Sequence, residues 1–208
     1  MPTLAPMMTR LLRGLPEGGG ARDRVAELYW QAFGAQLGPA LGPAAAGRRF
    51  IAAHLDPDRA LTAVSPDGRV LGVVGFQLAG RGLIGGDTAA VRAEYGQVRG
   101  LWRAYLLALS QRTPARGELV LDGIAVDRSE PGLEVEALLL EGVEAVAAEQ
   151  GCRRVRLDVA AGDTAARARY EGLGFRAVRV PRTPWPRDVL GFGAVTTLHR
   201  SVPPQPGT

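Results

Sequence analysis

Residues 119–175 contain two short apolar segments, each followed by a helical pattern, and this alternation constrains the fold most strongly. Residues 119–126 are almost continuously apolar, as in a strand that is buried on both faces. Residues 133–150 carry apolar side chains along one stripe of a helix. A second apolar segment at 155–159 precedes a helical stretch at 164–173. We therefore expect a strand–helix–strand–helix unit over these residues.

A hairpin and two helices are expected before this unit. The segment 65–68 has the composition of a turn, and it separates two apolar strands at 61–64 and 70–78. Helical spacing of apolar residues predicts helices over 22–33 and 47–55. The chain between these helices contains residues that interrupt a helix, namely Gly34, Gly38, Pro39, Gly42 and Pro43.

Further elements complete the expected order. Residues 87–111 favour a helical region that is interrupted near Gly100. A short first strand is expected at 10–13, and the last strands are expected at 177–180 and 195–198. Asp163 is the expected N-cap of the helix that follows it.

The composition suits one globular domain. The chain has 208 residues, of which 46% are hydrophobic and 22% charged, so it can bury an ordinary core. We expect a single domain over 1–208, with disordered ends near 1–10 and 203–208. All 25 basic residues are arginine, yet the net charge is only +4 and acidic residues are interleaved with them. Nucleic-acid binding is therefore not expected, because such proteins concentrate their positive charge on one face or tail.

Several other classes of protein do not match the sequence. Cys152 is the only cysteine, which excludes an intrachain disulfide. No apolar segment is long enough to cross a membrane, and the N-terminus lacks the pattern of a secretion signal. We therefore expect a cytoplasmic protein without membrane contact. His54 and His199 lie far apart in the sequence, so no metal site is expected.

Two motifs in the strand–helix–strand–helix unit resemble a known family. The first expected strand ends in Gly-Ile-Ala-Val-Asp at 123–127, and the last helix ends in Tyr-Glu-Gly-Leu-Gly-Phe at 170–175. Both are similar to motifs of the GCN5-related N-acetyltransferases (GNAT). The resemblance is close over 119–175 and looser over the rest of the chain. It implies an α/β (mixed α+β) fold: a central mixed, mostly antiparallel sheet of about six to seven strands, with splayed parallel central strands, flanked by helices.

The resemblance also implies acetyl-CoA as co-substrate. In this family the pantetheine arm lies between the two splayed strands, which would end here near residues 126 and 159. The pyrophosphate rests on the N-terminus of the next helix, where free N–H groups attract anions. Tyr170 matches the tyrosine that often protonates the departing CoA thiolate. The implied coenzyme-binding residues are Ile124, Ala125, Val126, Gly132, Leu133, Glu134, Val135, Glu136, Ala137, Asp163, Ala166 and Tyr170.

The phosphate-binding loop departs from the family pattern. The positions of an arginine or glutamine, a glycine, and a glycine or alanine are occupied here by Pro131, Glu134 and Glu136, and only Gly132 is retained. Pro131 has no N–H to donate. One carboxylate at about 5 Å repels a phosphate charge by roughly 3 kcal/mol, or about a hundredfold in affinity. Acidic residues also stabilise the start of a helix. Arginines that could compensate are Arg128, Arg167 and Arg169.

Two carboxylates are candidates for the general base. Asp122 lies four residues before Val126, where family members often place such a carboxylate, and Glu118 lies on the same face of the strand. A carboxylate in a half-buried cleft can have its pKa raised toward the working pH, as a base requires. For Asp122, local capping or pairing is an equally open reading.

Two functions from different classes follow. The first is an acetyl-CoA-dependent N-acetyltransferase that acts on a primary amine of an unknown small molecule or peptide. The second is a catalytically degenerate scaffold of the same fold, which binds another ligand or a protein partner. A third reading is that Tyr170 and Phe175 only pack a helix into a core of a different fold. Many members of the family form dimers, and the sequence does not decide between a monomer and a homodimer.

Overall fold

One mixed sheet runs through the part of the chain that the structure describes. The structure is a computed structural model, which describes residues 9–78, 80–85, 114–127, 132–160, 162–178 and 195–203. The strands are β1 (Arg10–Arg13), β2 (Ala60–Val64), β3 (Val70–Gln77), β4 (Glu118–Val126), β5 (Arg154–Ala160), β6 (Arg176–Val178) and β7 (Val195–Ser201). They form a seven-stranded sheet in the order β1-β2-β3-β4-β5-β7-β6. Neighbouring strands are antiparallel except β4 and β5, which are parallel.

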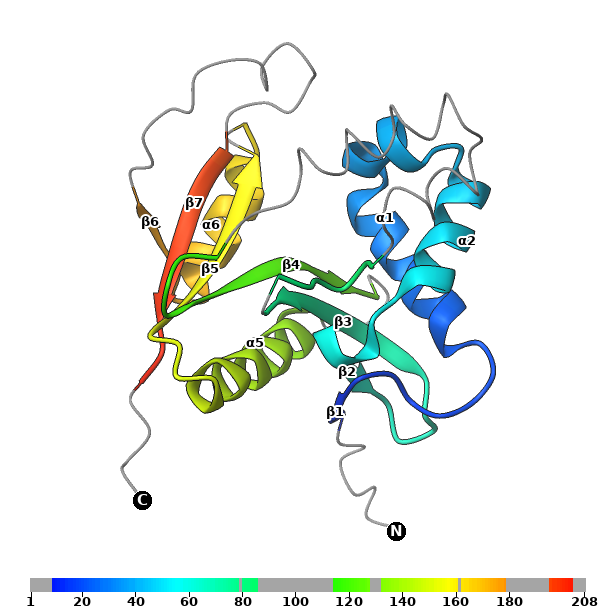
Figure 1. Ribbon diagram of the computed structural model, residues 1–208, viewed down its shortest axis with the longest axis horizontal. Helices are drawn as coiled ribbons and strands as arrows, with labels where there is room; N and C mark the ends of the chain where they lie inside the picture. Colours follow the sequence, from blue (N-terminus) through cyan, green and yellow to red (C-terminus); the bar gives the residue numbers. More distant parts are fainter. Residues whose placement is uncertain are drawn as a thin grey trace, which may run out of the picture.

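Helices cover both faces of this sheet. They are α1 (Ala21–Leu41), α2 (Ala44–His54), the short 3₁₀ helix η1 (Pro57–Arg59), α5 (Gly132–Glu149) and α6 (Thr164–Gly172). Helices α1 and α2 lie on one side of β2–β4, and α5 lies on the other side (Figure 1). The mixed, mostly antiparallel sheet with flanking helices that the resemblance implies is confirmed.

Two apolar cores hold the layers together, one on each face. The first joins the sheet to α5 and α6, and its members include Leu121, Leu139 and Phe175. The second joins the sheet to α1 and α2 through residues such as Leu28 and Ile51. Since Tyr170 belongs to the first core, α6 lies on the same face as α5.

The N-terminal half follows the predicted elements with two corrections. The predicted break after Phe33 is wrong, because α1 continues through Gly34 and Pro39 to Leu41. A helical glycine costs only about 1 kcal/mol, and Gly34 makes room for the Trp30 side chain. Pro39 stands in the last turn of α1, and burial of Ala40 and Leu41 keeps that turn in place. Helix α2 begins at Ala44, directly after Pro43 and earlier than expected.

The hairpin and the helix termini agree with the sequence. Strands β2 and β3 pair across the predicted turn, in which Gly68 has a φ of 85°. Helix α5 ends at Glu149 and is capped by Gly151, which has a φ of 67°. The Cys152 amide donates to the Ala147 carbonyl at 2.8 Å, as in a Schellman motif. The Asp163 side chain accepts from the Ala166 amide at 2.9 Å, so Asp163 is the N-cap of α6.

The parallel strands β4 and β5 separate, as expected. They pair only from Glu118↔Arg154 to Val120↔Arg156. Beyond that point β4 continues along β3 as far as Val126, and β5 continues along β7 as far as Ala160. Figure 1 shows the two strands diverging toward their C-terminal ends.

A β-bulge accounts for the bend of β4 at this point. Gly123 pairs with Gly75 and Leu121 pairs with Phe76, which leaves Asp122 as the extra residue. A bulge bends its strand and increases the local twist. The divergence of β4 from β5 begins at this bulge.

Several segments predicted from the sequence lie outside the described residues. The helical region at 87–111, the segment 179–194 before β7, and the C-terminal tail from 204 lie outside the described residues. No helix in the described ranges is long and apolar enough to cross a membrane.

Candidate active site

The diverging ends of β4 and β5 form the centre of the candidate site. The outer edge of β4 is bonded to β3, and the outer edge of β5 is bonded to β7. Their inner edges are not paired with one another beyond Val120 and Arg156. Ile124 and Ala125 have side chains buried in the cores on the two faces of the sheet. The inner edge of β4 is therefore formed here by backbone groups. Backbone amides and carbonyls at such an edge need hydrogen-bond partners, and an amide-containing arm can supply them.

Helix α5 begins beside this opening. It starts at Gly132, the retained glycine, while Pro131 lies outside the described residues. Glu134 is exposed and Ala137 is half-buried. Val135 is buried in the core and packs over Gly72 of β3, where any Cβ would lie 2.9 Å from Val135 Cγ1. The start of α5 is therefore anchored on the sheet.

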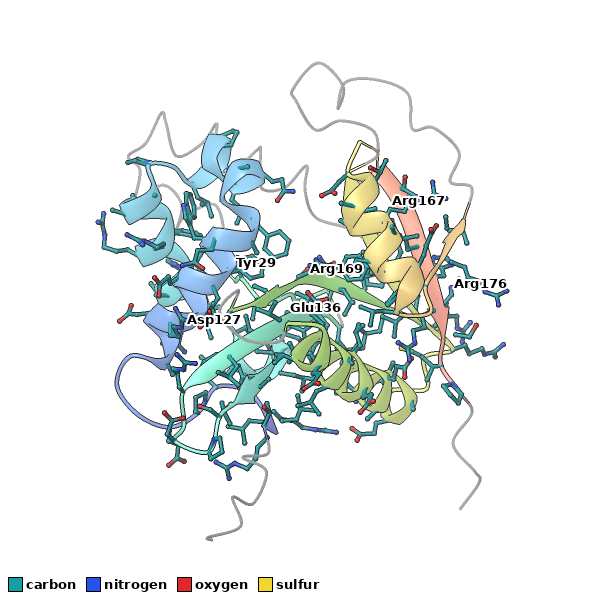
Figure 2. The ribbon with its side chains drawn as sticks, turned by 180° about the vertical axis from the view of Figure 1, so that it is seen from behind. Tyr29, Asp127, Glu136, Arg167, Arg169 and Arg176 are labelled. Atoms are coloured by element: carbon teal, nitrogen blue, oxygen red, sulfur yellow. The ribbon has the colours of Figure 1, made fainter. Side chains whose placement is uncertain are left out.

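Glu136 is buried in the second turn of α5 and faces α6. Its side chain is 2% exposed, and its Oε1 lies 3.2 Å from Arg169 Nη1. Its Oε2 has no hydrogen-bond partner. Burial raises the pKa of Glu136, and the Arg169 charge offsets part of this effect. Figure 2 shows both side chains directed toward one another near the start of α5.

Tyr170 completes this cluster from α6. The residue is 6% exposed, and its ring makes an edge contact with Phe175 at a centroid distance of 5.9 Å. The Arg169 guanidinium lies 5.4 Å from the centroid of the Tyr170 ring. Burial raises the pKa of Tyr170, and the charge of Glu136 adds to the rise while that of Arg169 opposes it. Tyr170 therefore keeps its proton at neutral pH.

The carboxylate of Asp122 is held by two donors. Gln77 Nε2 lies 2.6 Å from Oδ1, and the Leu83 amide lies 2.7 Å from Oδ2. Tyr29 donates to the backbone carbonyl of Asp122 at 3.3 Å. Asp122 thus ties the segment around Leu83 to the bulge of β4, and it lies where the two strands begin to part. Local pairing accounts for these contacts, and a catalytic role is compatible with this position.

Glu118 lies at the closed end of the β4–β5 pair. Its Oε1 accepts from Arg154 at 2.9 Å and lies 3.3 Å from His199 Nε2. Its Oε2 accepts from the Ala115 amide at 3.1 Å and lies 3.7 Å from Arg156 Nη1. Burial alone would raise the pKa of Glu118, but these hydrogen bonds and charges outweigh it and lower the pKa. These contacts favour a structural role for Glu118 over the predicted role of base.

The arginines predicted to compensate for the altered loop differ in position. Arg167 pairs with Glu171 at 2.8 Å on the exposed side of α6, and Arg128 lies outside the described residues. Arg169 alone of the three is seen beside Glu136 (Figure 2). The sequence named Arg169 as one of three candidates and did not distinguish it from the others, because its partner lies on another helix. The signal available in the sequence was that Arg169 directly precedes Tyr170.

The site can be compared with the chemistry of acetyl-CoA. The edges of β4 and β5 that do not pair with one another suit the amide groups of a pantetheine arm. The N-terminal turn of α5 suits a pyrophosphate, except that Glu136 is buried close by. Arg169, which pairs with Glu136, is the cation beside this turn. The residues fit the coenzyme if the charge of Glu136 is neutralised.

Comparisons with known proteins agree with this geometry. The model of the acetyltransferase (GNAT) family matches residues 22–175. No curated protein shows a significant sequence match. A GCN5-related N-acetyltransferase from Kribbella flavida has 14% identity and a TM-score of 0.56, covering 95% of this chain and 99% of that one.

Two further solved structures have the same fold. A GNAT acetyltransferase from Staphylococcus aureus has 12% identity and a TM-score of 0.55, covering 94% of this chain and 100% of that one. An acyl-CoA N-acyltransferase structure from Klebsiella pneumoniae has 18% identity and a TM-score of 0.52, covering 94% and 99%. With a family model that spans most of its length, this chain belongs to the acetyltransferase (GNAT) family.

Proposed function

We propose that this protein transfers an acetyl group from acetyl-CoA to a primary amine of a small molecule or peptide. The observation that carries the proposal is the separation of β4 from β5 after Val120↔Arg156, with α5 beginning at its open end. That arrangement offers two strand edges that do not pair with one another, and a helix N-terminus, at the same opening. Family membership supports the same class of reaction.

In this proposal Tyr170 is the general acid. Acetyl-CoA supplies an activated thioester, and the amine attacks its carbonyl carbon. Burial raises the pKa of Tyr170, so the phenol is protonated at neutral pH and can donate its O–H to the leaving thiolate. The packing of Tyr170 against Phe175 fixes the direction of its ring.

Asp122 is the carboxylate that we propose as the base. It occupies the bulge at which the strands part, whereas Glu118 lies in the paired segment. The Gln77 and Leu83 donors fix the orientation of the Asp122 carboxylate. A carboxylate held in this way can take the amine proton directly or through a water molecule.

Coenzyme binding is the first test of the proposal. Isothermal titration calorimetry with acetyl-CoA is expected to give a saturable binding curve. Absence of binding at millimolar coenzyme would overturn the proposal. A screen of primary amines, with free thiol as the readout, then identifies the acceptor.

Tyr170→Phe tests the role of the acid. We expect kcat to fall by about 10²–10⁴, the usual contribution of general acid catalysis. The affinity for acetyl-CoA is expected to stay the same, because the phenyl ring keeps the packing against Phe175. An unchanged kcat would remove Tyr170 from the mechanism and leave coenzyme binding unaffected.

A further inference from the structure

Glu136 is an unusual residue to find at the start of α5. Its side chain is 2% exposed, yet one carboxylate oxygen has no hydrogen-bond partner. A buried charge with an unsatisfied oxygen is unfavourable, and the small residue typical of the family would avoid this cost. The geometry therefore points to a partner for Glu136 that the resting arrangement of side chains does not provide.

Arg169 is the only charged residue of the described chain that pairs with Glu136. It reaches Glu136 from α6 with Nη1 at 3.2 Å, and 44% of its side chain stays exposed. A half-exposed guanidinium can turn from a carboxylate to a nearby anion without being withdrawn from a core. Arg167, one half-turn away, is engaged with Glu171 on the outer side of α6.

We propose that Glu136 and Arg169 form a proton-linked anion site for the coenzyme pyrophosphate. Arg169 moves its guanidinium from Glu136 to the pyrophosphate, and the Glu136 carboxylate takes one proton from solvent. The protonated carboxyl of Glu136 then donates its O–H to an oxygen of the pyrophosphate. This site depends on the proposed function being correct. In it, Glu136 and Arg169 bind the pyrophosphate in place of the signature residues that the phosphate-binding loop lacks.

The surroundings of Glu136 favour such a proton uptake. From α6 it meets Arg169 and the neutral phenol of Tyr170, and on its own helix the nearest acid, Glu134, is exposed. The strands under α5 present apolar side chains to the shared core, among them Val74, Leu121 and Val159. Departure of Arg169 would remove the charge that lowers the pKa of Glu136 and leave only burial, which raises it.

The inference predicts a pH-dependent affinity. An ionised Glu136 close to one phosphate charge would weaken binding about a hundredfold. The affinity for coenzyme A is therefore expected to rise as the pH falls from the pKa of Glu136 in the complex to its pKa in the free folded protein. Below the pKa of the free protein the gain is complete.

Calorimetry of the unaltered protein tests the inference without a mutation. Coenzyme A is titrated at neutral pH in buffers of different ionisation enthalpy, which gives the number of protons taken up on binding. We expect about one more proton for the wild-type protein than for Glu136→Gln. Glu141→Gln is the matched control, an exposed glutamate of α5 more than one turn away from Glu136, and its proton uptake is expected to equal that of the wild type.

Arg169→Gln tests the second half of the site. Introduced into the Glu136→Gln protein, it is expected to reduce the affinity for coenzyme A by at least tenfold, because no ion pair with Glu136 remains to be broken. Glu136→Gln alone is expected to bind tighter than the wild type at neutral pH. Thermal unfolding confirms that each variant is folded.

The possible results separate the two proposals. Wild-type binding with the same proton uptake and affinity as Glu136→Gln would overturn the proton-linked site and leave the proposed function standing. An Arg169→Gln change without effect would also overturn the site. Failure of both the wild type and Glu136→Gln to bind coenzyme A would overturn the proposed function, and this inference with it.

Discussion

Two buried glutamates lie at opposite ends of the opening between β4 and β5, and their surroundings differ. Glu118, at the closed end, is 3% exposed in its side chain and contacts Arg154, Arg156, His199 and the Ala115 amide. Glu136, at the open end, is 2% exposed and contacts one guanidinium. The pKa of Glu118 is lowered, whereas that of Glu136 is raised.

The difference shows that burial alone does not decide the charge state of a carboxyl. Burial acts to raise the pKa in both cases, and the number of donors decides the direction. Glu118 has enough donors to remain ionised and hold two parallel strands together. Glu136 has too few, which suits a residue whose charge changes when a ligand binds.

The largest expected effect is on stability at the closed end. Glu118→Gln removes the counter-charge of Arg154 and one of those of Arg156. Losing the hydrogen bonds of a buried charged group costs about 1.5–3 kcal/mol of unfolding free energy. The cost of a charge left buried and unpaired is not added, because Arg154 and Arg156 are 45% and 22% exposed. Urea denaturation at neutral pH should show a loss of about that size.

A matched variant controls for the loss of a glutamate charge as such. Glu171→Gln removes an i,i+4 pair with Arg167, whose side chains are 40% and 47% exposed. Its cost should not exceed about 0.5 kcal/mol. Equal losses for Glu118→Gln and Glu171→Gln would contradict the structural role given to Glu118.

At the open end, replacing the glutamate is expected to raise the free energy of unfolding instead of lowering it. Glu136→Met replaces a buried carboxylate by an unbranched apolar side chain of similar size. Arg169 can then turn to solvent, since its side chain is 44% exposed. Replacing a poorly satisfied buried charge by an apolar group is often stabilising, here by about 1–2 kcal/mol in the free energy of unfolding. A loss of unfolding free energy comparable to that of Glu118→Gln would show that Glu136 stabilises the fold as Glu118 does.

The sequence predicted the order of elements well because that order rests on local patterns. The turn at 65–68, the Gly151 cap and the Asp163 cap are all contained in a few neighbouring residues. The extension of α1 through Gly34 and Pro39 was missed for the opposite reason. It depends on the burial of Ala40 and Leu41 against other elements, which no local pattern reveals.

The candidate site was less predictable, because its properties arise from pairing between distant segments. By sequence Asp122 was the first candidate for the base and Glu118 the second. Strand pairing distinguishes them: β4 pairs Glu118 with Arg154 of β5, whereas the ladder between β4 and β3 leaves Asp122 in a bulge. Likewise, only the contact between α5 and α6 identifies Arg169 as the partner of Glu136.

The dependence of stability on pH sharpens the comparison further. The folded pKa of Glu118 is lowered, so its contribution is present above the ordinary pKa of about 4.3 and is lost as the pH falls through the folded value. The folded pKa of Glu136 is raised, so its contribution is present below about 4.3 and is lost as the pH rises through the folded value.

Each glutamate contributes a slope of at most about 1.4 kcal/mol per pH unit. Glu118→Gln should therefore flatten the acidic side of the stability profile, and Glu136→Gln should flatten the decline above pH 4.3. Urea denaturation between pH 3 and 8 measures both. If both variants altered the same side of the stability profile, the directions assigned to the two pKa shifts would be wrong.

The smallest expected effect comes from a single cation at the closed end. Arg154→Gln removes one donor to Glu118, but the Ala115 amide, Arg156 and His199 remain in contact with the carboxylate. The Arg154 side chain is 45% exposed, so water replaces much of what its charge supplies. We expect a loss of less than about 1 kcal/mol in unfolding free energy. A loss as large as that of Glu118→Gln would mean that Arg154 alone keeps Glu118 ionised, and the contrast with Glu136 would then rest on one residue instead of on a network.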